Sequence, residues 1–130
     1  MSESTPTTDE HGILHVAKVW GEEHWIVNRE YCGKKLVLRQ GFRCSMHFHR
    51  VKDEVFYVLR GRVLLEAGDE VRVLEPGSMQ HIPPGLHHRF WGLEDAEMIE
   101  FSTHHEDEDS YRLEVSGPFE PEEAKGLGVV

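Results

Sequence analysis

Short runs of alternating hydrophobic and polar residues follow one another along most of this chain, and glycines or charged residues separate the runs. The alternation has the two-residue period of a half-buried strand, and it predicts strands at residues 13–19, 25–28, 35–39, 43–49, 55–59, 63–66, 71–74, 87–91 and 96–102. Pro76-Gly77 and Pro83-Pro84-Gly85 are strong turn signals between them. Residues 121–126 fit one helical turn. Many short antiparallel strands predict an all-β jelly roll or barrel.

The length of 130 residues and the mass of 15.0 kDa predict one domain with a single core. We expect this domain at residues 13–115. Residues 1–12, rich in Ser, Thr, Asp and Glu, are too polar to bury much apolar area and are expected to form a flexible arm. Residues 116–130 form a C-terminal tail that either wraps a neighbouring chain or stays loose.

The formal net charge of -10 disfavours nucleic acids and anionic membranes as partners, because both would repel the protein. No run approaches the roughly 18 apolar residues that cross a bilayer. Cys32 and Cys44 show no paired spacing and no apolar leader precedes them, so a disulfide framework is not expected, although a single bridge stays open. We therefore expect a soluble cytoplasmic protein with a small-molecule partner.

Two histidines and a carboxylate stand close together between Gly41 and Gly61. His47 and His49 point to the same face of an extended strand, and Glu54 can return to that face after a short turn. His88, after the stiff turn at residues 83–85, completes the set. Three imidazoles and one carboxylate suit a divalent transition metal (Mn, Fe, Co, Ni, Cu or Zn) and leave coordination positions for a substrate.

These segments match both motifs of the cupin superfamily, G-x5-H-x-H-x4-E-x6-G from Gly41 to Gly61 and G-x5-P-x-G-x2-H from Gly77 to His88. The chain departs from the second motif only at Gly92, where the family has asparagine. The resemblance implies a double-stranded β-helix, the cupin jelly-roll barrel, and a homodimer that pairs through edge strands. The metal ligands that it implies are His47, His49, Glu54 and His88.

Residues near these ligands are candidates for holding a substrate. Strand alternation places Arg43 and Ser45 on the face of the two ligand histidines that follow them, where they would bind substrate. Lys52, in the turn between two ligands, either aims its ammonium at a substrate oxygen or is simply solvated. Arg89 follows a ligand directly and is expected to face away from the site.

Further segments resemble cupin sugar isomerases. Trp20-Gly21, residues 25–28 and residues 31–34 are similar to a region of phosphomannose isomerases, and Lys34 stands where the lysine of those enzymes would fall. Lys34-Lys35 equally fits a strand edge with one lysine exposed, and tryptophans also fill barrel mouths or dimer interfaces. Residues 98–112 are similar to the late strand and loop of isomerases of the lyxose and mannose type.

Glu100 has two orientations open to it. It either enters the cavity beside Met98 or lies outside with Ile99 inward, and the periodicity favours the outside whereas the resemblance favours the inside. Inside the cavity, its carboxylate could pass a proton between adjacent sugar carbons.

The remaining histidines carry weaker signals. His104, His105 and Asp107 are expected in a solvated acidic loop, with a second metal site or a lid as the alternative. The histidines that lack a partner at a metal-binding spacing are treated as background: His11, His15, His24 and His81.

Three functions fit this set of residues. The leading hypothesis is a metal-dependent aldose–ketose isomerase that acts on a mannose-like, lyxose-like or phosphorylated sugar through a metal-stabilised enediol, with Glu100, Lys52 and Lys34 as catalytic candidates. The second is an iron-dependent cupin dioxygenase, which requires a dry apolar cavity without a lysine or a further carboxylate. The third is a sugar-binding cupin without catalysis.

Overall fold

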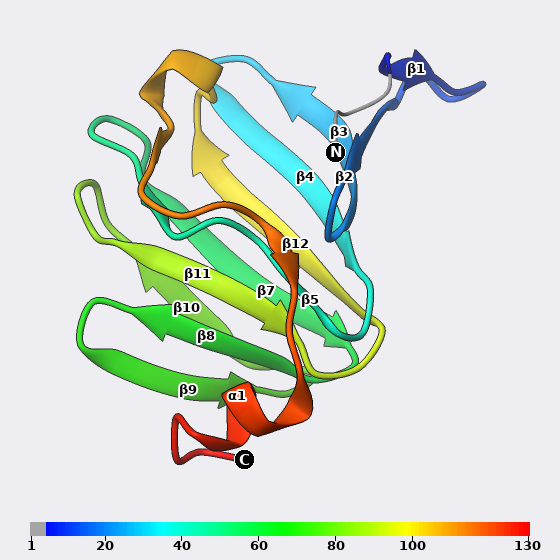
Figure 1. The fold of residues 1–130 in the computed structure, drawn as a ribbon. Helices are drawn as coiled ribbons and strands as arrows, with labels where there is room; N and C mark the ends of the chain where they lie inside the picture. Colours follow the sequence, from blue (N-terminus) through cyan, green and yellow to red (C-terminus); the bar gives the residue numbers. More distant parts are fainter. Residues whose placement is uncertain (1–4) are drawn as a thin grey trace.

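The computed structural model describes residues 5–130, which fold into two antiparallel sheets that face each other (Figure 1). The elements are β1 (Thr7–Thr8), β2 (Leu14–Lys18), β3 (Gly21–Asn28), β4 (Tyr31–Leu38), β5 (Phe42–Arg43), β6 (His47–Phe48), β7 (Glu54–Arg60), β8 (Val63–Ala67), β9 (Glu70–Leu74), β10 (Met79–Ile82), β11 (His88–Gly92), β12 (Ala96–Thr103), the 3-10 helix η1 (Asp107–Asp109), β13 (Tyr111–Arg112), β14 (Gly117–Pro118) and α1 (Pro121–Lys125). This confirms the all-β jelly roll.

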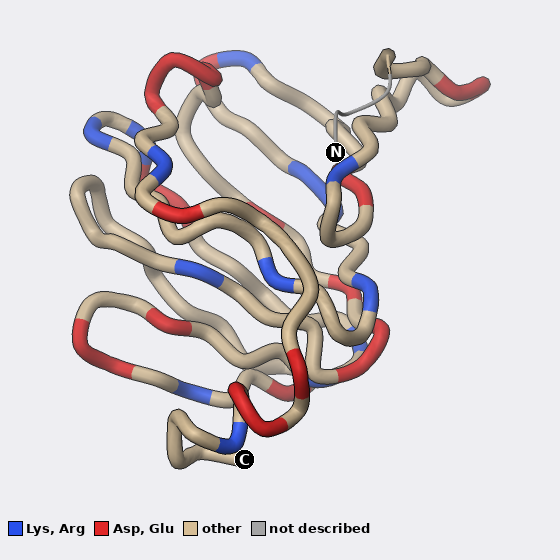
Figure 2. The backbone as a smooth tube through the Cα atoms, in the orientation of Figure 1, with Lys and Arg blue, Asp and Glu red and all other residues tan. Residues whose placement is uncertain are grey.

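The first sheet has the strand order β1-β2-β3-β4-β12-β7-β10, and the second has the order β13-β6-β11-β5-β14, with β8 joined to β11 and β9 joined to β8. Strands far apart in the sequence, such as β4 and β12, are therefore neighbours. Figure 2 shows acidic and basic residues interspersed along the described backbone. Within residues 5–130, no helix is long and apolar enough to span a membrane.

The inward face of the first sheet changes from apolar to polar along its strands. Side chains alternate across a strand, so every second residue of β4, β12 and β7 faces the second sheet. Three successive inward rows are Leu36, Met98 and Val58; then Lys34, Glu100 and Phe56; then Cys32, Ser102 and Glu54. The first row belongs to the hydrophobic core, and truncating its fully buried Met98 to alanine should cost about 2–5 kcal/mol. Four residues of the rows that follow line a largely polar cavity, namely Lys34, Glu100, Phe56 and Glu54.

The predicted strand at residues 43–49 is interrupted. It forms the short strands β5 and β6, and residues 44–46 between them belong to neither strand, so that the three residues between Arg43 and His47 stand against the two between His88 and Trp91 of β11. As a result Cys44 and Ser45, which are neighbours in the chain, are both buried, at 3% and 4% exposure. Alternation therefore fails at this point, and this changes the predicted position of Arg43.

Gly92, the one departure from the second cupin motif, lies where two segments approach closely. A Cβ atom at this position would lie 2.6 Å from the carbonyl oxygen of Arg39. The Gly41 N–H also donates to the Gly92 carbonyl at 2.9 Å. Glycine is therefore needed for the close contact of these two chain segments.

Both ends of the described chain pack on the domain. Strand β1, inside the segment expected to be an arm, pairs with β2, while residues 1–4 lie outside the described residues. Strand β14 pairs with β5, and the helical turn predicted near residue 121 is confirmed as α1. Ala124 of α1 packs with Leu64 and Trp91 on the outer side of the second sheet. The tail is thus held by its own chain.

Candidate metal centre

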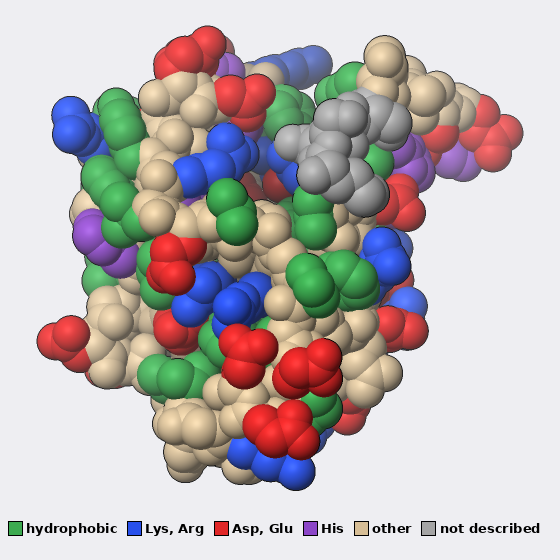
Figure 3. All heavy atoms as spheres, in the orientation of Figure 1, with side chains coloured by type: hydrophobic (Ala, Val, Ile, Leu, Met, Phe, Trp, Pro, Cys, Tyr) green, Lys and Arg blue, Asp and Glu red, His purple; other side chains and the backbone are tan. Residues whose placement is uncertain are grey.

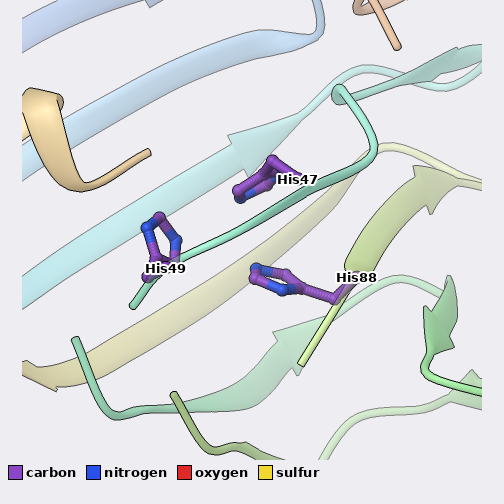
Figure 4. Close-up of side chains that lie close together, drawn as sticks. All are labelled: His47, His49 and His88. Atoms are coloured by element: carbon purple, nitrogen blue, oxygen red, sulfur yellow. The ribbon is translucent and has the colours of Figure 1, made fainter. Parts of the chain in front are cut away.

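Three histidine side chains converge at the polar end of the space between the sheets (Figure 4). His47 lies on β6, His49 follows that strand, and His88 begins β11 and pairs directly with His47. One ring nitrogen of each lies within 4.8 Å of the others. Glu54, at the start of β7, places its Oε2 atom 3.2 Å from His49 Nε2 and 3.3 Å from His88 Nε2. We call these four residues the cavity cluster.

The backbone orients all three imidazoles in the same way. Each Nδ1 atom lies at hydrogen-bond distance from a carbonyl oxygen, which can only accept. Each Nδ1 therefore carries the proton, and each Nε2 keeps its lone pair, which is the arrangement that metal-binding histidines need. The three bonds run from His47 to Ser45 O (2.7 Å), from His49 to Asp109 O (3.1 Å) and from His88 to Leu86 O (2.9 Å).

The atoms that point into the cluster lack hydrogen bonds. His49 Nε2, His88 Nε2 and Glu54 Oε2 are buried and form no hydrogen bond of good geometry within residues 5–130. Buried polar atoms are nearly always satisfied, so a group of three that face one another needs a shared partner. A divalent cation meets this need, and the cavity cluster therefore fits the metal that its residue types predict.

The electrostatics of the cluster favour the protonation states that bind metal. Burial, helped by the neighbouring His88, lowers the pKa of His47 to about 3, so its ring stays neutral. Burial alone would raise the pKa of Glu54, but the imidazoles of His49 and His88 and the ammonium of Lys52 hold that pKa well below its usual range. The cluster thus presents a neutral His47 imidazole and an ionised Glu54 carboxylate.

Glu100 lies inside the cavity, beside Met98, so the inward orientation is the one that the structure shows. Its side chain is 5% exposed. Its Oε2 atom accepts hydrogen bonds from Lys52 Nζ at 3.0 Å and from Ser102 Oγ at 3.2 Å. A second carboxylate therefore stands in the same cavity as the cavity cluster.

Lys52 is buried rather than solvated. Its Nζ atom lies 3.0 Å from Glu100 Oε2, 3.6 Å from Glu54 Oε1 and 3.1 Å from His105 Nδ1. Burial opposes its charge, but the two carboxylates outweigh that effect and raise the pKa of Lys52. The side chain is consequently a cation and a hydrogen-bond donor at neutral pH.

The turn that carries Lys52 is held by Asp109, a residue that the sequence did not single out. The Asp109 carboxylate accepts the backbone N–H groups of Arg50, Val51 and Lys52 at 2.9–3.2 Å. Its backbone carbonyl also orients His49. In the sequence, only the acidic run at residues 106–109 drew attention to Asp109. Its contact with residues 50–52 arises from the fold, which brings these two distant segments together.

Lys34 faces the cavity, and β4 lies between β3 and β12, so the alternative of a strand edge is wrong, although one lysine of the pair does point outward. Its Nζ atom lies 4.0 Å from the centre of the Trp25 ring and 3.5 Å from Glu23 Oε1, and the Trp25 indole N–H donates to the same oxygen at 2.9 Å. Burial alone would raise the pKa of Glu23, but Lys34 and other cations keep it lowered. Lys35 is the lysine that points outward, toward Glu97.

His105 also corrects the prediction of a solvated loop. Its side chain is 9% exposed and lines the cavity, whereas His104 nearby is 48% exposed. Nδ1 faces Lys52 Nζ, so the proton on Nε2 is donated to Asp107 at 2.9 Å. Burial and the charges of Lys34 and Lys52 lower the pKa of His105, which favours the neutral ring.

The two residues predicted to bind substrate, Ser45 and Arg43, lie on different sides of the second sheet. Ser45 lines the cavity, with its Oγ atom 3.4 Å from His47 Nδ1. Arg43 instead reaches Glu123 at 3.2 Å and stacks over the Trp91 ring at 4.5 Å, on the outer side of the second sheet. The break after β5 explains this error.

Arg89 pairs with Glu66 at 2.7 Å, away from the cavity cluster, as predicted.

The cavity has an apolar floor and a charged wall. Leu36, Phe56 and Phe90 form the floor, and Lys18, Asp107 and Arg112 lie among the other lining residues. A small polar molecule could therefore meet both carboxylate and ammonium groups there.

Solved structures share this fold. KdgF from Halomonas sp. is 21% identical, with a TM-score of 0.63 over 81% of this chain and 90% of that chain. CapF, a capsular polysaccharide assembling protein from Staphylococcus aureus, is 22% identical, with a TM-score of 0.67 over 79% of this chain and 34% of that chain. At these identities the likeness concerns the fold.

A protein from Arthrobotrys oligospora that is named an oxidoreductase is 30% identical over 94 residues, which are 67% of this chain. The chain spans only 37% of the length of that relative. A family model described as the cupin domain matches residues 35–111, which include the whole cavity cluster. Since this match covers more than half of the chain, the chain belongs to the cupin domain family.

Proposed function

We propose that this cupin is a metal-dependent enzyme that moves a proton between adjacent carbons of a sugar, as an aldose–ketose isomerase does. The observation that supports it is the Glu100 carboxylate, buried in one cavity with the cavity cluster and bonded to Lys52. A divalent ion such as Mn, Fe, Co, Ni or Zn, when bound, supplies Lewis acidity toward a substrate carbonyl.

The residues of the chain have distinct roles in this proposal. Glu100 acts as the base, because its carboxylate is oriented by Lys52 and Ser102 and faces the cavity. Lys52 remains protonated, so it is not the base and instead stabilises negative charge that develops on a substrate oxygen. Neutral His105 accepts a hydrogen bond from Lys52 through Nδ1 and so helps to hold the ammonium group in place.

The substrate class rests on the cavity and on one similar protein. Trp20 and Lys34 line the cavity and offer an aromatic and a cationic group suited to a polyhydroxylated or phosphorylated molecule. CapF, which shares the fold, is described as assembling a capsular polysaccharide. Both support a free or phosphorylated sugar as the small-molecule substrate. The homodimer and the cytoplasmic location stay predictions.

An iron-dependent dioxygenase is the second candidate, and the oxidoreductase name of the Arthrobotrys oligospora relative is the observation in its favour. The apolar floor of Leu36, Phe56 and Phe90 also suits oxygen chemistry. The buried Lys52–Glu100 pair argues against it, since that chemistry requires a dry apolar cavity.

Metal-stripped protein reloaded separately with Mn, Fe, Co, Ni or Zn, and supplied with free and phosphorylated aldoses, tests the proposal by ketose formation. We expect turnover that depends on the metal with at least one sugar. Oxygen consumption by the iron-loaded protein, without ketose formation, would establish the second candidate instead. Metal binding and sugar binding without turnover of either kind would establish a non-catalytic sugar-binding cupin.

A further inference from the structure

Two histidines treated as background in the sequence meet on the outer face of the first sheet. His15 on β2 lies directly opposite His24 on β3, and their ring centres are 4.0 Å apart. Glu22 shares the face of His24, because the two are separated by one residue on a strand. Glu23, between them, lines the cavity, so this group lies on the opposite face of the sheet. We call His15, Glu22 and His24 the outer cluster.

The outer cluster brings potential metal-ligand atoms together. One such atom from each of its three residues lies within 4.8 Å of the others. Glu22 Oε1 is 3.6 Å from His15 Nδ1 and 3.2 Å from His24 Nε2. Figure 3 shows histidine side chains among acidic ones at the surface near β1 and β2.

Asp9 orients one of these ligands. Its Oδ2 atom accepts a hydrogen bond from His15 Nε2 at 2.8 Å, which leaves Nδ1 of the same ring directed toward Glu22. Its Oδ1 atom accepts the backbone N–H groups of His11 and Ile13 at 2.8 and 3.0 Å, so the carboxylate is itself held in the turn before β2. A carboxylate that supports the far nitrogen of a histidine is a recurrent feature of protein metal sites.

The geometry points to a second transition-metal site, in which His15 Nδ1, His24 Nε2 and Glu22 bind a divalent ion of the zinc class. Two imidazoles and one carboxylate suit Zn, Co, Ni or Cu. The side chains of His15, Glu22 and His24 are 33%, 51% and 20% exposed, so water completes the coordination. The site is separate from the cavity, and the inference does not depend on the function proposed for the cavity.

The ion would also tie together the beginning of the described chain. Its ligands lie on β2 and β3, and the supporting Asp9 precedes β2, next to the pairing of β1 with β2. Binding would therefore order residues 9–24 as one unit. This gives a readout that is independent of any activity.

Site-resolved binding of cobalt tests the inference. Metal-stripped protein is titrated with Co²⁺ while the histidine ring signals are followed by NMR, and bound metal is counted after equilibrium dialysis. We expect the signals of His15 and His24 to broaden at a saturable step, and a His24→Gln variant to lose one bound equivalent. The matched control is His81→Gln, since His81 is 52% exposed and pairs with Asp53 at 2.6 Å but joins no three-ligand group within residues 5–130.

Asp9→Asn sharpens the test, because it removes the supporting carboxylate and retains every ligand. We expect its affinity for Co²⁺ at the outer cluster to fall about 10–100-fold, with amide exchange at residues 9–24 no longer slowed by the metal. Circular dichroism of both variants checks that the fold persists. Unbroadened His15 and His24 signals would overturn the inference, whatever the cavity cluster binds. Equal metal content and affinity in the wild type, His24→Gln and Asp9→Asn would also overturn it.

Discussion

The cavity cluster lies between the two sheets, whereas the outer cluster lies on the outer face of the first sheet, and the two differ chiefly in burial. In both, an oxygen accepts the ring N–H of a histidine and leaves the other nitrogen directed at a carboxylate. Inside, burial lowers the pKa of His47 to about 3. Outside, the bond to Asp9 raises the pKa of His15. The same residue types thus form a buried site in which His47 resists protonation. They also form an outer site in which a metal ion competes with a proton for His15.

The two clusters also differ in what surrounds them. Beside the cavity cluster stand a buried ammonium and a further carboxylate, Lys52 and Glu100, within hydrogen-bond distance of each other. The outer cluster faces solvent, where charges are screened by water. We therefore assign proton transfer to the cavity and only metal binding to the outer face.

Removal of a cavity ligand should give the largest effect. His49→Ala is expected to lower the metal affinity of the cavity cluster by roughly 100-fold or more, exceeding the effect of lost supporting residues. Competition with a chelator measures it, and the outer cluster should be unaffected. His87→Ala is the control, because its ring stacks on Phe48 instead of joining the cluster. Full cavity affinity in His49→Ala would contradict the ligand assignment.

Lys52→Met should destabilise the protein by about 3–5 kcal/mol, because it leaves the Glu100 carboxylate buried without its cation. Urea denaturation of metal-free protein measures the change. The exposed counterpart, Lys35→Met, removes a partly exposed pair with Glu97 and should cost only about 0–1 kcal/mol. Similar losses of unfolding free energy in the two variants would show that burial does not determine how much the Lys52–Glu100 pair contributes to stability.

Glu100→Gln should lower turnover by about 100-fold or more while the metal content stays unchanged, since a general base contributes on this scale. The rate is measured with whichever sugar the panel identifies. Glu97→Gln is the matched control on the same strand, as Glu97 points outward to Arg60. Unchanged turnover in Glu100→Gln would remove this carboxylate from the mechanism.

The smallest expected effect is on the stability of the metal-free protein as the pH changes. The contributions of the two clusters to that stability should change in opposite directions. Folded His47 resists protonation, so its contribution to stability is lost as the pH falls from 6.5 toward about 3. The His15–Asp9 bond contributes fully below pH 6.5 and is lost as the pH rises past the raised pKa of His15. NMR titration of each ring measures both, and coincident titrations would refute the comparison.

The sequence by itself predicted the all-β fold and the convergence of His47, His49, Glu54 and His88. These features depend on local relations, namely the two-residue period of a strand and the turns at fixed distances from each histidine. The motif spacing therefore contains the information needed to bring the four side chains to one place.

Only the tertiary structure decided the residues around that cluster. Both faces of β12 carry apolar side chains, and the periodicity favoured the outward orientation of Glu100, which the pairing of β12 with β4 and β7 showed to be wrong. Arg43 turns outward because the chain breaks between β5 and β6, and His105 turns inward because Lys52 and Trp25 meet it there. The outer cluster likewise depends on the hairpin of β2 with β3, which the sequence prediction missed because the strand expected at residues 25–28 begins after His24, so nothing placed His24 opposite His15 until the two strands were paired.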